Sequence, residues 1–111
     1  MPDPSLSEQL SRQFSVLQLD QVPANVIAAA KLHILDSLGC LLAGSRLEPG
    51  KLAYNLAVAT SGASANHSST LFGANLKVST LDGVQAMATA AHCGELDDIH
   101  GGAATCIGAM V

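Results

Sequence analysis

The apolar residues of this chain are almost all aliphatic or small. Of its 111 residues, 49% are hydrophobic, yet only 3% are Phe, Tyr or Trp. The aromatic residues are Phe14, Tyr54 and Phe72. A core made of Ala, Leu, Val and Ile suits helices that approach one another closely, because small side chains shorten the distance between helix axes. We therefore expect a mainly α fold.

Periodicity and capping signals predict two helices in the first half of the chain. Ser5 is followed three residues later by Glu8, which is the capping-box pattern at a helix start. Residues 24–43 then form the longest helix, with an apolar stripe so wide that we expect burial on more than one side. His33 and Asp36 are three residues apart and are expected to pair on its less apolar face.

A third helix is expected over residues 49–60, with Leu52, Leu56 and Ala59 turned inward. Residues 61–69 are small and polar and predict a loop. Residues 70–78 predict two short strands joined by a turn, a hairpin that must pack on the helices.

The fourth helix is expected to begin at Ser79 or Thr80, with Asp82 in its first turn, and to run toward Glu95. Gly44 is expected to end the longest helix. The chain as a whole is thus predicted to be a helical-bundle fragment with a short β-hairpin.

Composition excludes several classes of function. The net charge is −4, and the five basic residues are scattered, so we expect no nucleic-acid partner. The three cysteines have no CxxC spacing and predict reduced thiols in a cytoplasmic protein. No secretion signal is recognised at the start, and the apolar stretch 32–43 is expected to be too short to span a membrane.

The titratable groups gather in residues 92–100, where an apolar helix gives way to acids and imidazoles. His92 and Glu95 are three residues apart and would share a helix face. Acids at a helix C-terminus are disfavoured by the helix dipole, and their crowding raises a carboxyl pKa toward the range of a general acid or base. A solvated acidic surface, a catalytic wall and a metal site all remain open. The metal set considered is His92, Glu95, His100 and Cys106, although its spacing fits no standard zinc pattern.

Three stretches resemble the MmgE/PrpD family. Residues 35–45 (LDSLGCLLAGS) resemble its "LDtlGcalAGs" helix. Residues 72–73 and 86–100, which end in HCGELDDIH, resemble its segment with paired acids and a following His. Residues 108–111 resemble the start of its "hPGavvvp" stretch. Together these matches cover nearly the whole chain in order.

The resemblance assigns candidate catalytic residues position by position. Glu95 falls where many members have the first Asp of "D-F-D-D-T", and keeps the carboxylate. Asp97 and Asp98 match the paired acids directly. His100 matches a His that follows the Thr in many members.

The same resemblance assigns three residues to substrate binding, with two departures from the family pattern. Ile99 replaces the Thr that would contact substrate. Thr105 stands where the active-site His of "HPG" usually lies, and Cys106 replaces the Pro. His92 would support the wall that the acids form.

By resemblance, the chain is the N-terminal portion (1–111) of the all-helical domain of a two-domain, homodimeric enzyme, truncated after Val111. Such enzymes act on small di- or tricarboxylates by proton abstraction next to a carboxylate, with no cofactor. The missing C-terminal domain would carry the substrate-binding lysines, so the fragment is expected to be inactive by itself. Two other hypotheses are a helical dimerisation module and a small metal-binding protein.

Overall fold

The computed structural model describes residues 4–61 and 69–106. The chain divides into two units, Met1–Lys31 and Leu32–Val111. The first unit holds α1 (Leu6–Ser15), a short 3-10 helix η1 (Leu19–Gln21) and the start of α2 (Ala24–Gly44). The predicted capping box at α1 is confirmed: the Glu8 backbone N–H donates to Ser5 Oγ, and the Ser5 backbone N–H donates to the Glu8 carboxylate.

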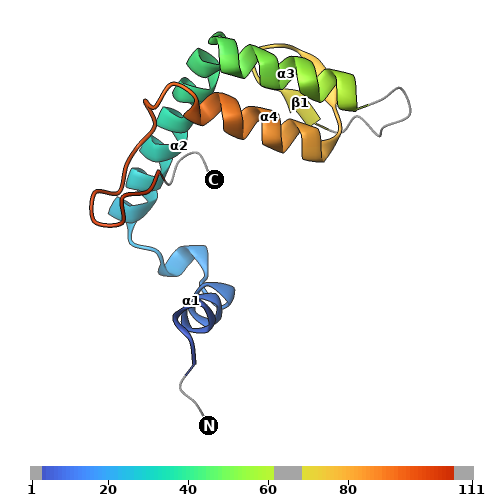
Figure 1. Cartoon of the computed structure of the whole chain (residues 1–111). Coiled ribbons are helices and arrows are strands. Elements are labelled where there is room, and N and C mark those ends of the chain that lie inside the picture. The colour runs from blue at the N-terminus through green and yellow to red at the C-terminus, as the bar shows by residue number, and fades with distance from the viewer. Residues whose placement is uncertain (1–3, 62–68, 107–111) are drawn as a thin grey trace. The chain divides into compact units, whose positions relative to one another are not determined.

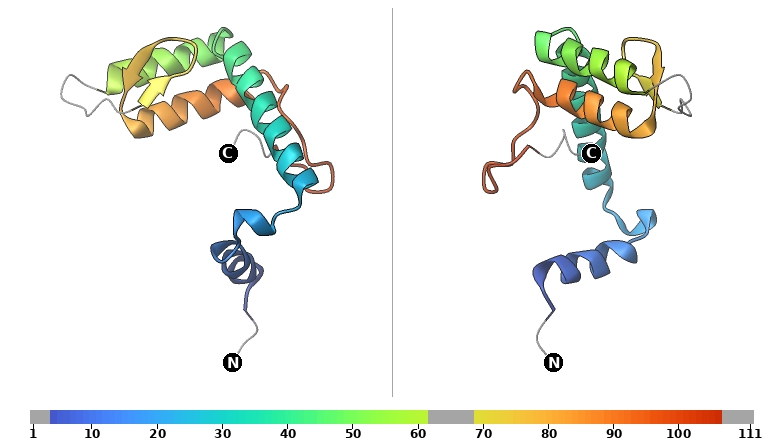
Figure 2. Two further views of the ribbon diagram at one scale, coloured as in Figure 1. Left: turned by 180° about the vertical axis from the view of Figure 1, so that it is seen from behind. Right: turned by 45° about the vertical axis from the view of Figure 1, so that its right-hand side comes forward.

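The second unit holds the rest of α2, then α3 (Glu48–Thr60), β1 (Ser69–Leu71), β2 (Leu76–Val78) and α4 (Thr80–His92). Helices α3 and α4 lie side by side, and the two strands pack beside them (Figure 1). The view from behind shows the same pairing (Figure 2). The fold is mainly α with a short hairpin, as the sequence predicts.

The hairpin is antiparallel, with Ser69 opposite Val78 and Leu71 opposite Leu76. Its turn includes Gly73 (φ +79°) and Asn75 (φ +50°), residue types that tolerate a left-handed backbone. Leu71 and Val78 are fully buried, so each strand contributes one side chain to the core. The predicted hairpin is therefore confirmed.

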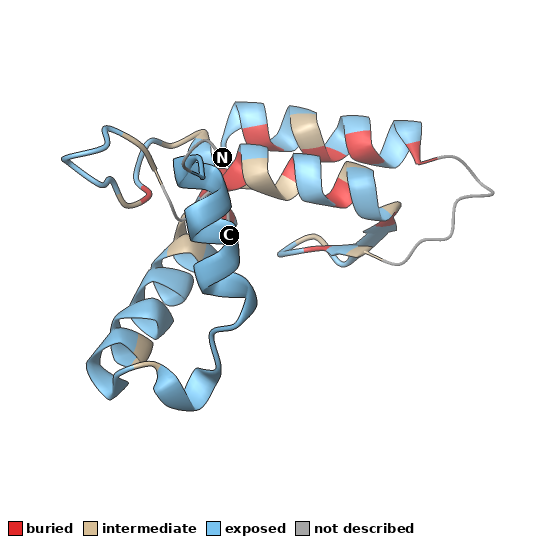
Figure 3. Cartoon of the chain, turned by 90° about the horizontal axis from the view of Figure 1, so that it is seen from below, coloured by how far each residue is buried: buried red, intermediate tan, exposed pale blue. Residues whose placement is uncertain are grey.

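The core forms where α3 and α4 face each other and meet the hairpin (Figure 3). Its buried apolar residues are Leu41, Tyr54, Ala57, Leu71, Val78, Ala86, Ala90 and Ala91. The expected inward face of α3 is wrong, because Leu52 and Leu56 are 62% and 57% exposed and Ala59 is exposed. The buried residues of α3 are Gly50, Tyr54 and Ala57 instead.

Glycines make the junction of the three helices possible. A Cβ on Gly44 would lie 1.8 Å from the Ala90 carbonyl oxygen, and a Cβ on Gly50 would lie 2.0 Å from the Gly44 carbonyl oxygen. A side chain at either position would therefore collide with the neighbouring backbone. Gly44 is the last residue of α2, as expected, and the close contact explains why it is glycine.

Hydroxyls tie the end of α3 to the start of α4. Ser79 caps α4 by accepting from the Asp82 N–H, which confirms the predicted helix start. The buried Ser61 hydroxyl accepts from the Ser79 N–H at 3.0 Å. Asp82 accepts hydrogen bonds from Ser79, Thr60 and Ser61, and these lower its pKa.

Helix α2 is 21 residues long, and by length and composition it could cross a membrane. The helix was expected over residues 24–43, and the apolar stretch 32–43, expected to be too short to span a membrane, is its C-terminal part. A core helix of a water-soluble protein meets the same criteria, so the absence of a membrane partner stays a prediction. The expected burial of α2 on more than one side is not found among the described residues, where Leu41 and Gly44 are its buried positions.

Candidate functional site

The candidate site is the segment that follows α4, residues 93–106, which runs back along α2 (Figures 1 and 2). Helix α4 ends at His92, and the Glu95 N–H donates to the His92 carbonyl in a tight turn. Glu95 has φ +49°, a left-handed conformation that ends helical geometry. His92 and Glu95 therefore do not share a helix face. That expectation is wrong because the helix stops three residues before the predicted end.

The turn after the helix places Asp97, rather than Glu95, against His92. Both Asp97 carboxylate oxygens lie 3.1 Å from His92 Nδ1. The Asp97 side chain is 1% exposed, whereas that of His92 is 54% exposed. The carboxylate thus fixes the imidazole from the protein side and leaves the rest of the ring toward solvent.

A second turn, between His100 and Thr105, brings the chain back to the His92–Asp97 pair. His100 and Thr105 form an isolated antiparallel bridge, with the His100 N–H donating to the Thr105 carbonyl at 2.8 Å. Within the turn, the Ala103 N–H donates to His100 Nδ1 at 3.0 Å. Because Cys106 directly follows Thr105, the bridge places it close to Asp97.

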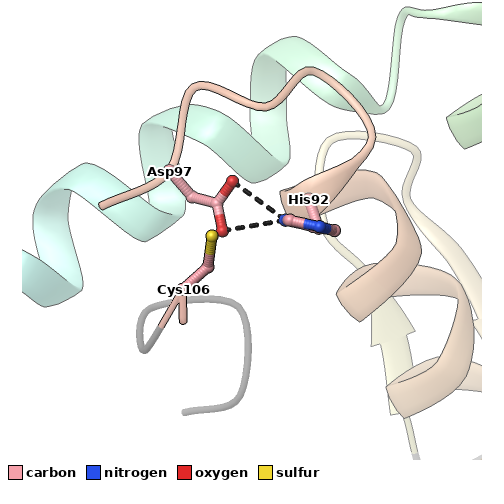
Figure 4. Close-up of side chains that lie close together, drawn as sticks. All are labelled: His92, Asp97 and Cys106. Atoms are coloured by element: carbon pink, nitrogen blue, oxygen red, sulfur yellow. Dashed lines mark hydrogen bonds and ion pairs between the residues drawn. The ribbon is translucent and has the colours of Figure 1, made fainter. Parts of the chain in front are cut away.

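Cys106 completes a cluster with His92 and Asp97 (Figure 4). One nitrogen, one carboxylate oxygen and one sulfur lie within 4.8 Å of one another. Burial raises the pKa of the Cys106 thiol, and the negative charge of Asp97, a hydrogen bond to Asp97 and the charges of Asp98 and Glu95 raise it further. The thiol therefore keeps its proton at neutral pH.

Asp98 turns to a different partner. Its carboxylate lies 2.9 Å from His33 Nδ1 on α2. The expected pairing of His33 with Asp36 is replaced by this contact, which links the segment to the helix. His33 is the residue of this arrangement that sequence reasoning missed, and its position within an apolar stretch was the available signal.

The segment also contributes Leu96 to a shallow, open apolar groove on α2, whose lining includes Leu35 and Cys40. Burial raises the pKa of Cys40, and the charges of Asp36, Asp97 and Asp98 raise it further. The groove is therefore a negatively charged environment, which disfavours an anionic ligand.

The predicted site residues fall into two groups. Asp97 and Asp98 are held by His92 and His33 respectively, so the paired acids point to different partners. Exposed along the same segment are Glu95, Ile99 and His100, and Thr105 is half-buried. Of the metal set considered from sequence, His92 and Cys106 come together, and Asp97 takes the place of Glu95 and His100.

The comparisons with known proteins give one family. The model of the MmgE/PrpD N-terminal domain matches residues 8–111, which includes the whole of the segment 93–106. No curated protein and no solved structure matches the chain.

Proposed function

Because the chain belongs to the MmgE/PrpD family, we propose that it is the N-terminal part of the helical domain of a cofactor-independent lyase or isomerase. The substrates proposed are small di- or tricarboxylates, and the reaction is proton abstraction next to a carboxylate. Dehydration, decarboxylation or epimerisation would follow. The observation that carries the proposal is the family match, which extends through the acidic segment.

We assign the proton transfer to the exposed groups of the segment. Glu95 and His100 present a carboxylate and an imidazole to solvent, and either group can accept a proton from a bound substrate. Ile99 and Thr105 flank them and are proposed to contact the substrate. Ile99 is 68% exposed, so its side chain is accessible to a ligand or to another domain.

The buried acid is assigned a positioning role. Asp97 is covered on nearly all sides, so it acts on the reaction through His92, whose ring it orients. Asp98 holds the segment to α2 through His33. Both acids therefore fix the backbone from which Glu95 and His100 project.

The charge of the site requires a second contributor. Carboxylate substrates bind best to Arg or Lys side chains, and no Lys or Arg follows Lys77 in the sequence. Glu95, Asp97 and Asp98 are all acidic. We propose that the cationic groups come from a further domain or from a second subunit, and that the 111-residue chain by itself is inactive.

A helical dimerisation module is the second candidate. It is favoured by the apolar side chains that α2 exposes in the second unit, namely Leu32, Ile34, Leu35, Leu38 and Leu42. Exposed apolar side chains gathered on one helix are a common feature of interaction surfaces. In the enzyme reading the same surface is covered by the rest of the protein.

The deciding experiment starts from the protein as its native source makes it. Its intact mass is measured, and the purified protein is incubated with small di- and tricarboxylates in D₂O while exchange of the hydrogen next to the carboxylate is followed by NMR. The enzyme reading predicts exchange that Glu95→Gln or His100→Gln reduces by at least about tenfold. No exchange with any carboxylate, from a protein of this chain's own mass, would instead support the dimerisation module.

A further inference from the structure

The cluster at the end of α4 contains the three kinds of atom that hold borderline metal ions in proteins. His92 provides an imidazole nitrogen, Asp97 a carboxylate oxygen and Cys106 a sulfur, all within 4.8 Å of one another. Each comes from a different part of the fold: the helix end, the turn after it and the residue beyond the His100–Thr105 bridge. We propose that His92, Asp97 and Cys106 bind a divalent metal ion of the zinc or cobalt class.

The distances fit this proposal. Neighbouring ligand atoms around tetrahedral zinc are about 3.3–3.7 Å apart, as follows from metal–ligand bonds of about 2.0–2.3 Å. The 3.1 Å between His92 Nδ1 and the Asp97 oxygens is close to that spacing. The Cys106 sulfur lies within 4.8 Å of the other two ligand atoms, so a small movement brings it to bonding distance of a shared ion.

The charges favour a cation at this point. The carboxylates of Asp97, Asp98 and Glu95 are the charged neighbours of Cys106. A bound dication would be attracted to all three. The metal displaces the thiol proton and forms a metal–sulfur bond, so binding releases that proton to solvent.

The ligand types select the metal. Nitrogen, oxygen and thiolate together suit Zn²⁺ and Co²⁺, whereas Mg²⁺ and Ca²⁺ prefer oxygen ligands. Three protein ligands leave one tetrahedral position open to water. The exposed half of the His92 ring shows that solvent reaches this side of the cluster.

The site would join the end of α4 to the returning chain, and it shares His92 and Asp97 with the positioning pair of the proposed lyase. Its ligands include neither Glu95 nor His100, the two groups assigned to proton transfer. A metal here would fix the backbone between residues 92 and 106, on which those two groups stand.

The test is a titration of the reduced full chain with Co²⁺ in the absence of oxygen. A cobalt–thiolate bond gives a charge-transfer band in the near ultraviolet, and a four-coordinate ion gives strong visible bands. We expect both bands to saturate at one equivalent, and to disappear on addition of Zn²⁺. In weakly buffered solution the pH should fall as the thiol proton is released.

Matched variants assign the ligands. Cys106→Ser should abolish the charge-transfer band, while Cys93→Ser leaves it unchanged. His92→Gln and Asp97→Asn should each weaken binding by about tenfold or more, since even outer residues of metal sites have effects of that size. Far-UV circular dichroism of each variant checks that the helices are retained.

Three results would overturn the assignment. One is a charge-transfer band that persists in Cys106→Ser. Another is loss of cobalt binding in Glu95→Gln or His100→Gln, which would point to the ligand set considered from the sequence. The third is a wild-type chain that binds neither Co²⁺ nor Zn²⁺ at 1:1 stoichiometry. None of these results bears on carbon–hydrogen exchange, so the metal site and the lyase proposal fail separately.

Discussion

Asp97 holds His92 with both of its oxygens, each 3.1 Å from Nδ1, while its own side chain is withdrawn from solvent. In the absence of a metal ion, a carboxylate in this position favours the tautomer in which Nδ1 carries the proton and Nε2 is the acceptor. Metal binding at Nδ1 would require that proton to move to Nε2. The pair therefore sets the direction in which the exposed half of the ring points.

The substitution Asp97→Asn tests this positioning in the complete protein. The amide keeps the shape but removes the charge, so the tautomer of His92 is no longer selected. We expect turnover to fall by roughly 10²-fold or more, with little change in KM and an altered pH–rate profile. The matched control is Asp20→Asn in η1, which should leave kinetics unchanged. Near-normal turnover in Asp97→Asn would remove this residue from the mechanism.

The contact between α2 and α4 gives a prediction with an internal control. Gly44→Ala places a methyl group against the Ala90 carbonyl, where a Cβ would lie 1.8 Å from the oxygen. We expect the free energy of unfolding to fall by about 3 kcal/mol, because backbone cannot move aside cheaply. Gly39→Ala, in the same helix with nothing within 4 Å of its Cβ, should raise it by up to about 1 kcal/mol. Urea unfolding of both variants measures the difference, and equal effects would contradict the close packing.

The hydroxyl cluster around Asp82 predicts a sensitivity to acid. Hydrogen bonds from Ser79, Thr60 and Ser61 lower the Asp82 pKa in the folded state below its unfolded value. This group therefore stabilises the fold at pH values above the unfolded pKa, and that contribution is lost as the pH falls through the folded pKa. Thermal unfolding between pH 6 and about pH 3 should show a shallower loss of stability in Asp82→Asn than in the wild type. If the two proteins lost stability in parallel as the pH falls, protonation of Asp82 would not be linked to unfolding.

The environment of Cys106 predicts slow alkylation at neutral pH. Its pKa is raised by burial and by the charges of Asp97, Asp98 and Glu95, so the reactive thiolate forms at higher pH than in a free cysteine. The rate of reaction with iodoacetamide is measured against pH in a Cys40→Ser/Cys93→Ser background, where Cys106 is the remaining thiol. Adding Asp97→Asn should move the midpoint to lower pH, because it removes one of the charges. An unchanged midpoint would show that Asp97 does not affect the pKa of Cys106.

Local features of the fold were predictable from the sequence. The Ser5–Glu8 capping box, the Ser79 cap of α4 and the hairpin around Gly73 each depend on residues close together in the chain, and the structure confirms them. The family could also be identified from short motifs, since these keep their order and spacing.

Faces and partners were not predictable in the same way. Helix α3 has apolar residues on two sides, and periodicity favoured the face with Leu52, Leu56 and Ala59. The structure buries Gly50, Tyr54 and Ala57 instead, because that face of α3 packs in the core with α4 and the hairpin.

The sequence determined which residues start each helix, where the hairpin turns and which segment concentrates the acids and imidazoles, because these depend on local backbone preferences. Only the tertiary structure decided that His92 pairs with Asp97, that His33 pairs with Asp98 and that Cys106 returns to the end of α4. Those partners depend on where α4 stops and how the chain reverses after it. A change of one turn in the helix would redirect every side chain that follows.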